Sequence, residues 1–148
     1  MPNSAPQTSE RSLSEHDLVA AVKEAQKQAY APYSNFPVGA VIRTASGQIF
    51  SGCNVENASY PEGTCAEAGA IANMVMHGGR DIAEIYVIGN GDGLVSPCGG
   101  CRQRIREFSN PNTTIHICGP EGVRKVITIS ELLPYSFGPE HLIPKQAG

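Results

Sequence analysis

The chain lacks several features that commonly indicate what a protein does. It has no tryptophan, and aromatic residues make up only 6% of it. Its formal net charge of −3 leaves no basic excess to bind a phosphate backbone, so we expect no nucleic-acid partner. No apolar run reaches the length of a membrane span, which predicts no membrane partner, and the polar N-terminal stretch lacks the apolar core of a signal peptide. These absences favour a cytoplasmic protein that acts on a small neutral molecule.

The length of 148 residues and a hydrophobic content of 41% predict one globular domain with a single core. Residues 1–12 are polar, contain two prolines and show no periodicity, which predicts a disordered N-terminal tail. The domain is then expected over residues 13–148. Ser12 and Glu15 form a candidate capping box for a first helix that runs to Tyr30.

Hydrophobic patterns and turn residues predict the element order α-β-β-α-β-α-β-β-α, and therefore helices packed on a mixed five-stranded sheet of the α/β class. The expected strands cover residues 38–43, 48–53, 83–89, 113–118 and 123–129. The helices expected after the first cover residues 65–77, 99–108 and 131–133.

Three of the five cysteines have the spacing of a metal site. Cys98 and Cys101 are separated by two residues, the usual spacing of a zinc-binding pair, and Cys65 would be supplied by another element. No histidine or second cysteine lies within ten residues of Cys65. Catalytic zinc sites typically keep three protein ligands and an open fourth position, so this set predicts a catalytic zinc centre.

Glu67 has a role beside such a centre. Zinc lowers the pKa of water bound to it to about 7, and a nearby carboxylate can take the proton of that water and pass it to a leaving group. Residues two apart point to nearly opposite sides of a regular helix, so Cys65 and Glu67 can reach one metal ion only where a helix begins, outside its regular turns. This predicts that the zinc lies at a helix N-terminus. The alternative is that Glu67 merely stabilises the helix dipole.

The pattern Cys-x-Glu followed by Pro-Cys-x-x-Cys resembles the zinc-dependent cytidine deaminase superfamily. The resemblance extends from about residue 30 to residue 142, and it is specific to the small homotetrameric deaminases of free nucleosides. The blocks that carry it are Tyr-Ser-Asn-Phe-Pro-Val-Gly-Ala at 33–40, Gly-Cys-Asn-Val-Glu-Asn-Ala at 52–58, Ser-Pro-Cys-Gly-Gly-Cys-Arg-Gln at 96–103 and Leu-Leu-Pro-Tyr-Ser-Phe-Gly-Pro-Glu-His-Leu at 132–142.

The resemblance implies a three-layer fold, one Zn²⁺ per chain, and hydrolytic deamination of cytidine and deoxycytidine to uridine and deoxyuridine in pyrimidine salvage. It implies a homotetramer whose sites are shared between subunits. The implied catalytic residue is Glu67 and the implied metal ligands are Cys65, Cys98 and Cys101. The implied substrate-binding residues are Phe36 on the pyrimidine, Asn54 and Glu56 on the 3′-hydroxyl, Ala66 and Ser96 on the pyrimidine edge, and Phe137 on a base bound in the next subunit.

One position departs from the family pattern. Many members with three cysteine ligands carry an arginine after the catalytic glutamate, and this chain has Ala68. Three thiolates around Zn²⁺ leave a net charge of −1, which we expect the helix dipoles and Arg102 or Arg104 to offset.

Three alternatives stay open. A deaminase of the same fold could act on blasticidin S or on a modified base, since the antibiotic deaminases also lack that arginine. A non-catalytic zinc-stabilised domain would need a closed shell, with Cys53 or Cys118 as fourth ligand. Polynucleotide editing is the third alternative, and the charge of the chain disfavours it.

Overall fold

The structure is a computed structural model that describes residues 13–143, so the predicted tail and the last five residues of the predicted domain lie outside the described residues. The elements follow the predicted order, which confirms the α/β class and the mixed five-stranded sheet. The helices are α1 (Glu15–Lys27), α2 (Ala66–Met76), α3 (Gly99–Glu107) and α4 (Ile129–Leu132), with 3-10 turns η2 (Tyr60–Glu62) and η3 (Pro139–His141). The strands are β1 (Gly39–Thr44), β2 (Ile49–Cys53), β3 (Ile82–Ile88), β4 (Ser109–Gly119) and β5 (Gly122–Thr128).

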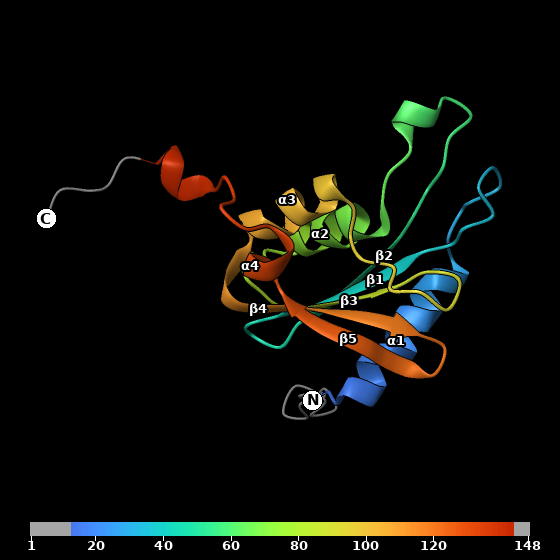
Figure 1. The fold of residues 1–148 in the computed structure, drawn as a ribbon, viewed down its shortest axis with the longest axis horizontal. Coiled ribbons are helices and arrows are strands. Elements are labelled where there is room, and N and C mark those ends of the chain that lie inside the picture. The colour runs from blue at the N-terminus through green and yellow to red at the C-terminus, as the bar shows by residue number, and fades with distance from the viewer. Residues whose placement is uncertain (1–12, 144–148) are drawn as a thin grey trace, which may run out of the picture.

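The sheet has the order β2-β1-β3-β4-β5. The β3–β4 pair is parallel and the other three pairs are antiparallel, so the sheet is mixed. Figure 1 shows three layers, with α1 on one face of the sheet and α2, α3 and α4 on the other. The parallel pair requires a crossover, which α3 provides, and this crossover brings the start of α3 to the same face as α2.

The first helix begins later than the sequence analysis predicts. Its N-cap is Ser14, whose Oγ accepts a hydrogen bond from the amide of Asp17 at 3.2 Å, while Asp17 Oδ2 accepts one from the amide of Ser14 at 3.0 Å. The predicted capping box of Ser12 and Glu15 is therefore wrong. A shift of two residues lets an aspartate serve in the reciprocal bond that glutamate or glutamine usually makes.

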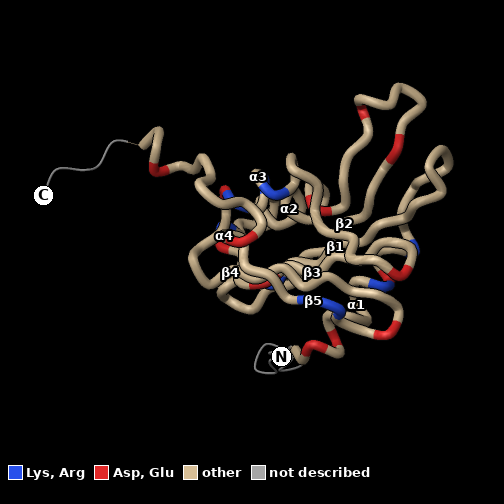
Figure 2. The backbone as a smooth tube through the Cα atoms, in the orientation of Figure 1, with Lys and Arg blue, Asp and Glu red and all other residues tan. Residues whose placement is uncertain are grey.

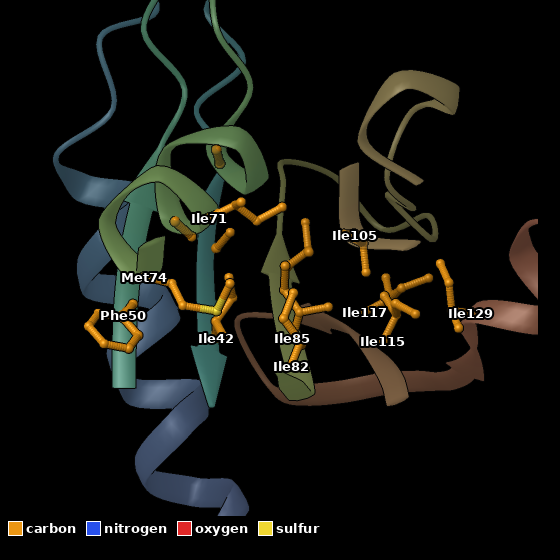
Figure 3. Close-up of a cluster of buried hydrophobic side chains, with 14 residues drawn as sticks. Ile42, Phe50, Ile71, Met74, Ile82, Ile85, Ile105, Ile115, Ile117 and Ile129 are labelled. Atoms are coloured by element: carbon orange, nitrogen blue, oxygen red, sulfur yellow. The ribbon is translucent and has the colours of Figure 1, made fainter. Parts of the chain in front are cut away.

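The larger hydrophobic core fills the space between the sheet and helices α2, α3 and α4 (Figure 3). Alternate residues of a strand face opposite sides of a sheet, so Ala40 and Ile42 belong to this core while Val41 packs on the α1 side. Isoleucines supply most of the strand side chains here, namely Ile42, Ile82, Ile85, Ile115 and Ile117. The core holds α2 and α3 firmly against one face of the sheet.

A glycine sets how closely α2 approaches the sheet. A Cβ at Gly52 of β2 would lie 2.2 Å from the amide nitrogen of Ala70 and 2.5 Å from the carbonyl oxygen of Ala66. Backbone therefore packs on backbone at this contact, which only glycine permits. The small residues of α2 serve this helix-to-strand contact, and it fixes the height of the α2 N-terminus above the sheet.

Besides the loop between α1 and β1, two segments extend away from the body of the molecule (Figure 1). One is the arm, residues 54–64, which carries η2 and the exposed side chains of Val55 and Tyr60. The other is the C-terminal segment, residues 133–143, which carries η3 and the exposed side chain of Phe137. Within residues 13–143, every helix is too short or too polar to cross a membrane.

Candidate metal centre and active site

Two helices begin at the same place. Cys65 is the N-cap of α2 and Cys98 is the N-cap of α3, and their Sγ atoms lie 4.0 Å apart. Cys101 lies in the first turn of α3 and is buried. The positive ends of both helix dipoles are thus directed at the thiols, where they favour negative charge.

The arrangement of the three cysteine thiols fits a zinc ion. The sulfur atoms of Cys65, Cys98 and Cys101 all lie within 4.8 Å of one another. Two thiolates about 2.3 Å from one zinc at a tetrahedral angle are about 3.8 Å apart, close to the 4.0 Å between Cys65 and Cys98. Among the described residues this group has three members, so a tetrahedral ion would keep one position for another ligand.

The structure does not recruit a fourth cysteine. Cys118 is buried in the cluster on the α1 side of the sheet, and its Sγ donates to the carbonyl oxygen of His116 at 3.5 Å. Cys53 ends β2 and, like Cys118, lies outside the group of described residues that could hold a metal. A closed four-cysteine site, as the non-catalytic alternative requires, has no support in this geometry.

The thiols differ in their protonation chemistry. A hydrogen bond from the backbone amide of Cys101 lowers the pKa of Cys98. Burial raises the pKa values of Cys65 and Cys101, and the nearby charge of Glu67 raises them further. Without a cation the three thiols therefore resist ionising together, whereas a divalent ion would supply the charge that all three thiolates need.

Glu67 sits in the first turn of α2 with only 4% of its surface exposed. Burial raises the pKa of its carboxyl group, and a backbone hydrogen bond and the charge of Arg104 act in the opposite direction. A carboxyl whose pKa is raised toward neutrality can both accept and return a proton, which is the property of a general acid–base group. Cys65, the N-cap, and Glu67, in the first turn, lie together at the start of α2, as the spacing predicts.

A cavity of about 320 Å³ opens beside the thiols. Its floor is the start of α2, one wall is the segment that precedes α3, and the arm forms the other wall. Five predicted site residues other than the three cysteines line this cavity. They are Asn54, Glu56, Ala66, Glu67 and Ser96. Tyr60, which belongs to the segment 57–60 that the resemblance brings to the ribose 5′ end from a neighbouring subunit, lines the cavity of its own chain. The sequence analysis missed the remaining lining residues, which are Val38, Val55, Gly63, Thr64, Val87 and Val95.

Glu56 is held rigidly at the rim. Its carboxylate accepts hydrogen bonds from the amides of Tyr33 and Ser34 at 3.0 and 3.1 Å and from the hydroxyl of Ser34. These bonds, led by that of the Ser34 hydroxyl, lower the pKa of Glu56 below its usual value. The group therefore presents a fixed negative charge to the cavity at neutral pH.

Asn54 joins the cavity wall to the loop before β1. Its Oδ1 accepts from the amide of Val38 at 2.8 Å, and its Nδ2 donates to the carbonyl of Phe36 at 2.9 Å. An asparagine amide carries two N–H donors, so these contacts use only one of them. The second N–H is the group that Asn54 can offer to a ligand.

The described residues that line the cavity include neither of the two predicted aromatic residues. Phe36 lies beside Gly89, where a Cβ would be 3.1 Å from Phe36 Cε1, next to the lining residue Val95. Phe137 stacks on His141 with ring centroids 5.2 Å apart, and its carbonyl accepts from Gln103 at 2.9 Å. The cavity formed by the described residues of one chain includes neither ring, and the roles predicted for them stay predictions.

Comparisons with known proteins agree with this geometry. Residues 13–117 match the family model described as the cytidine and deoxycytidylate deaminase zinc-binding region. The chain is 42% identical to a cytidine deaminase of Sporosarcina psychrophila over 84% of this chain and 92% of the relative. It is 38% identical to a cytidine deaminase of Halalkalibacterium halodurans over 84% and 95%. A crystal structure of a cytidine deaminase from Burkholderia pseudomallei superposes with a TM-score of 0.79 at 41% identity, covering 84% of this chain and 100% of that chain.

Proposed function

Because this chain belongs to the cytidine and deoxycytidylate deaminase family, we propose that it hydrolyses cytidine and deoxycytidine to uridine and deoxyuridine with release of ammonia. One observation carries the proposal. A buried carboxyl group, Glu67, lies at the start of α2 beside a group of three thiols, and Glu67 lines one cavity together with two of them, Cys65 and Cys98. The usual role of this reaction is pyrimidine salvage.

Cys65, Cys98 and Cys101 would hold the zinc ion, which would supply the Lewis acidity that makes water a nucleophile at neutral pH. Glu67 would receive one proton from the attacking water and deliver it to N3 of the pyrimidine. It would then take the remaining proton from the hydroxyl newly bound to C4 and pass it to the departing amino group, which leaves as ammonia while C4 becomes a carbonyl. Burial suits Glu67 for this relay, since the raised pKa lets the carboxyl group return the proton. Backbone groups of Cys65, Ala66 and Ser96 hold the edge of the pyrimidine, and the lining of the cavity by all three residues supports this role.

Glu56 and Asn54 bind the ribose. A carboxylate with two backbone donors behind it is fixed in direction, so it can accept a hydrogen bond from the 3′-hydroxyl without losing much side-chain freedom. The free N–H of Asn54 donates to the same hydroxyl. Phe36 completes the contact with the pyrimidine once a ligand fills the cavity.

The substrate is a free nucleoside rather than a nucleotide. The described residues that line this cavity and the adjoining one near Tyr33 include no lysine or arginine, while Glu56 and Glu67 are acidic. A 5′-phosphate would therefore enter a region of negative charge without a basic partner. The same charge pattern disfavours a polynucleotide.

The functional unit of the proposal is a homotetramer with sites shared between subunits. The arm and the C-terminal segment project from the body of the chain (Figure 1), and they expose Val55, Tyr60 and Phe137 to 47%, 76% and 55%. Exposed aromatic side chains on projecting segments are typical of subunit contacts. In the tetramer Phe137 stacks on a base bound by its neighbour.

A cytoplasmic location belongs to the same proposal. All five cysteines are free, and a catalytic group of three thiols requires a compartment that keeps thiols reduced. The catalytic domain of the proposal spans residues 13–148.

The test is turnover of cytidine and deoxycytidine by zinc-loaded protein, followed as loss of the cytosine absorbance. Glu67→Gln keeps the shape of the side chain but cannot relay a proton, so we expect turnover to fall by at least about a thousandfold with one zinc per chain retained. Glu24→Gln, an exposed acid on α1, is the matched control and should keep full activity. An active Glu67→Gln protein would contradict the role of Glu67. Zinc-loaded protein that converts neither nucleoside would contradict the substrate and direct the search to blasticidin S and modified pyrimidines.

A further inference from the structure

The metal centre carries an excess of negative charge. Three thiolates and one Zn²⁺ sum to −1, and Glu67 adds a buried carboxyl group beside them. Ala68, the next residue of α2, supplies no cation. A partly buried excess charge is costly unless a donor or a counter-ion compensates it.

Arg104 reaches this centre from the second turn of α3. Its Nη1 lies 3.8 Å from Sγ of Cys101, within the range of a hydrogen bond to sulfur. Side chains of a helix lean toward its N-terminus, so a residue at i+3 from Cys101 is directed back at the sulfur. Figure 2 shows basic residues on α3, and Arg104 is the one whose guanidinium contacts a thiol.

A glycine lies beside this contact. An ideal Cβ at Gly100 would lie 3.0 Å from Nη1 of Arg104, which is closer than a side chain normally allows. A Cβ at Gly99, one residue earlier, would meet no atom of the described residues within 4 Å. The two glycines between Cys98 and Cys101 are therefore not equivalent, because a side chain at position 100 would touch the guanidinium and one at position 99 would not.

The other arginines of α3 are committed elsewhere. Arg102 donates to the carbonyls of Pro97 and Leu132 at 2.8 and 2.9 Å and to the hydroxyl of Ser96 at 3.1 Å. Arg106 bonds to Ser136 and Glu140 in the C-terminal segment. The choice that the sequence analysis left open, Arg102 or Arg104, is thus decided by contact in favour of Arg104.

We propose that Arg104 is a positioning residue of the metal centre, which donates a hydrogen bond to the Cys101 thiolate and offsets the charge of the three-thiolate set. Arg104 and Cys101 are both absent from the described residues that line the cavity, so the guanidinium acts from the side of the centre away from the substrate. The inference rests on the metal site of the proposed function and is independent of its substrate.

The test uses the purified full-length chain with Co²⁺ in place of zinc, because thiolate-to-cobalt charge transfer reports directly on the sulfur ligands. A hydrogen bond lowers the energy of the sulfur lone pairs, so its loss in Arg104→Met should move the charge-transfer band to longer wavelength. Chelator competition should show zinc affinity reduced by about tenfold. Arg104→Lys keeps the charge and should recover most of the affinity. Lys27→Ala, which removes a distant exposed charge, is the control.

The adjacent glycines provide a second test that leaves Arg104 in place. Gly100→Ala would move the end of the guanidinium by a few tenths of an ångström and should give at most part of the spectral shift of Arg104→Met, whereas Gly99→Ala should keep the wild-type spectrum. A wild-type spectrum together with a zinc affinity within about twofold of wild type for Arg104→Met would overturn the proposal. Neither readout involves turnover, so a wrong substrate assignment would leave this test unaffected.

Discussion

The Sγ atoms of Cys65 and Cys98 lie 4.0 Å apart although the residues are 33 positions apart in the chain. Each is the N-cap of its helix, and both helices pack on the same face of the sheet. The metal centre is thus assembled only when α2 and α3 have docked on the core. Metal binding and folding are therefore coupled in this protein.

This coupling predicts that thermal stability depends on free zinc. A ligand that binds only the folded state adds about 1.4 kcal/mol for each tenfold increase in its concentration above the Kd. For a chain of this size that energy raises Tm by about 3–5 °C, and binding to cysteines of the unfolded chain would reduce the gain. The measurement is thermal unfolding in zinc buffers at fixed protein concentration.

Cys65→Ser should remove most of this dependence on zinc. Cys118→Ser is the control, since it changes a buried thiol on the other side of the sheet and should lower Tm without changing its slope against zinc concentration. Equal slopes for the two variants would contradict the assignment of the ligands.

The ribose contact of Glu56 can be tested with a substrate that lacks one hydroxyl. Hydrogen bonds to charged groups contribute about 1.5–3 kcal/mol, so Glu56→Gln should lower kcat/KM for cytidine by about 10- to 100-fold. The wild-type protein should lose a similar factor on 3′-deoxycytidine, while the variant should distinguish little between the two substrates. Additive losses, with the variant discriminating as well as the wild type, would show that Glu56 does not bind the 3′-hydroxyl.

Much of the fold could be predicted because its determinants are local. Strand β1 is buried along nearly its whole length, in keeping with the apolar, β-branched run that predicts it, and the α2 segment ends at a glycine pair as expected. The three thiols could be predicted because the spacing of Cys98 and Cys101 is itself a ligand pattern. These features need only a few neighbouring residues to specify them.

The rest of the site depends on contacts between segments that are distant in sequence. Gly63 and Thr64 line the cavity because the arm forms one of its walls, and their sequence context carries no signal of this position. The contact of Arg104 with Cys101 depends on the direction of the side chains on α3, and spacing alone could not distinguish it from a role of Arg102. Phe36 and Phe137 are the opposite case, because the resemblance gives both a contact with the ligand. The cavity formed by the described residues of one chain includes neither ring.

The N-cap of α1 can be tested by mutation, because the sequence analysis expects it at Ser12 and the structure has it at Ser14. Ser14→Ala removes the side-chain acceptor of the Asp17 amide and should lower the free energy of unfolding by about 1 kcal/mol. Ser12→Ala should leave stability unchanged within about 0.5 kcal/mol, because the helix begins after Ser14. Urea unfolding of both variants is the measurement. A larger loss for Ser12→Ala would favour the cap expected from sequence over the one in the structure.

His116 lies on the α1 side of the sheet, and its surroundings allow a prediction of how the free energy of unfolding depends on pH. Its ring is 7% exposed and stacks on Tyr86 at 4.2 Å, and its Nε2 lies 3.0 Å from the hydroxyl of Thr114. Its Nδ1 is buried with no hydrogen-bond partner among the described residues. Burial lowers the pKa of His116, and the charge of Arg43 adds to this, while Glu84 and Glu15 act in the opposite direction.

Because the pKa of His116 is lower in the folded state, the unfolded chain takes up a proton first as pH falls. The contribution to stability is therefore fully present above about pH 6.5 and is lost as pH falls from there to the folded pKa, by at most about 1.4 kcal/mol per pH unit. His116→Phe keeps an aromatic ring on Tyr86 but cannot titrate. Between pH 7.5 and 5.5 the free energy of unfolding should fall more steeply for wild type than for His116→Phe, with other titrating groups cancelling in the difference. Parallel curves would show that His116 ionises equally in both states, and that the buried Nδ1 accepts its proton without cost.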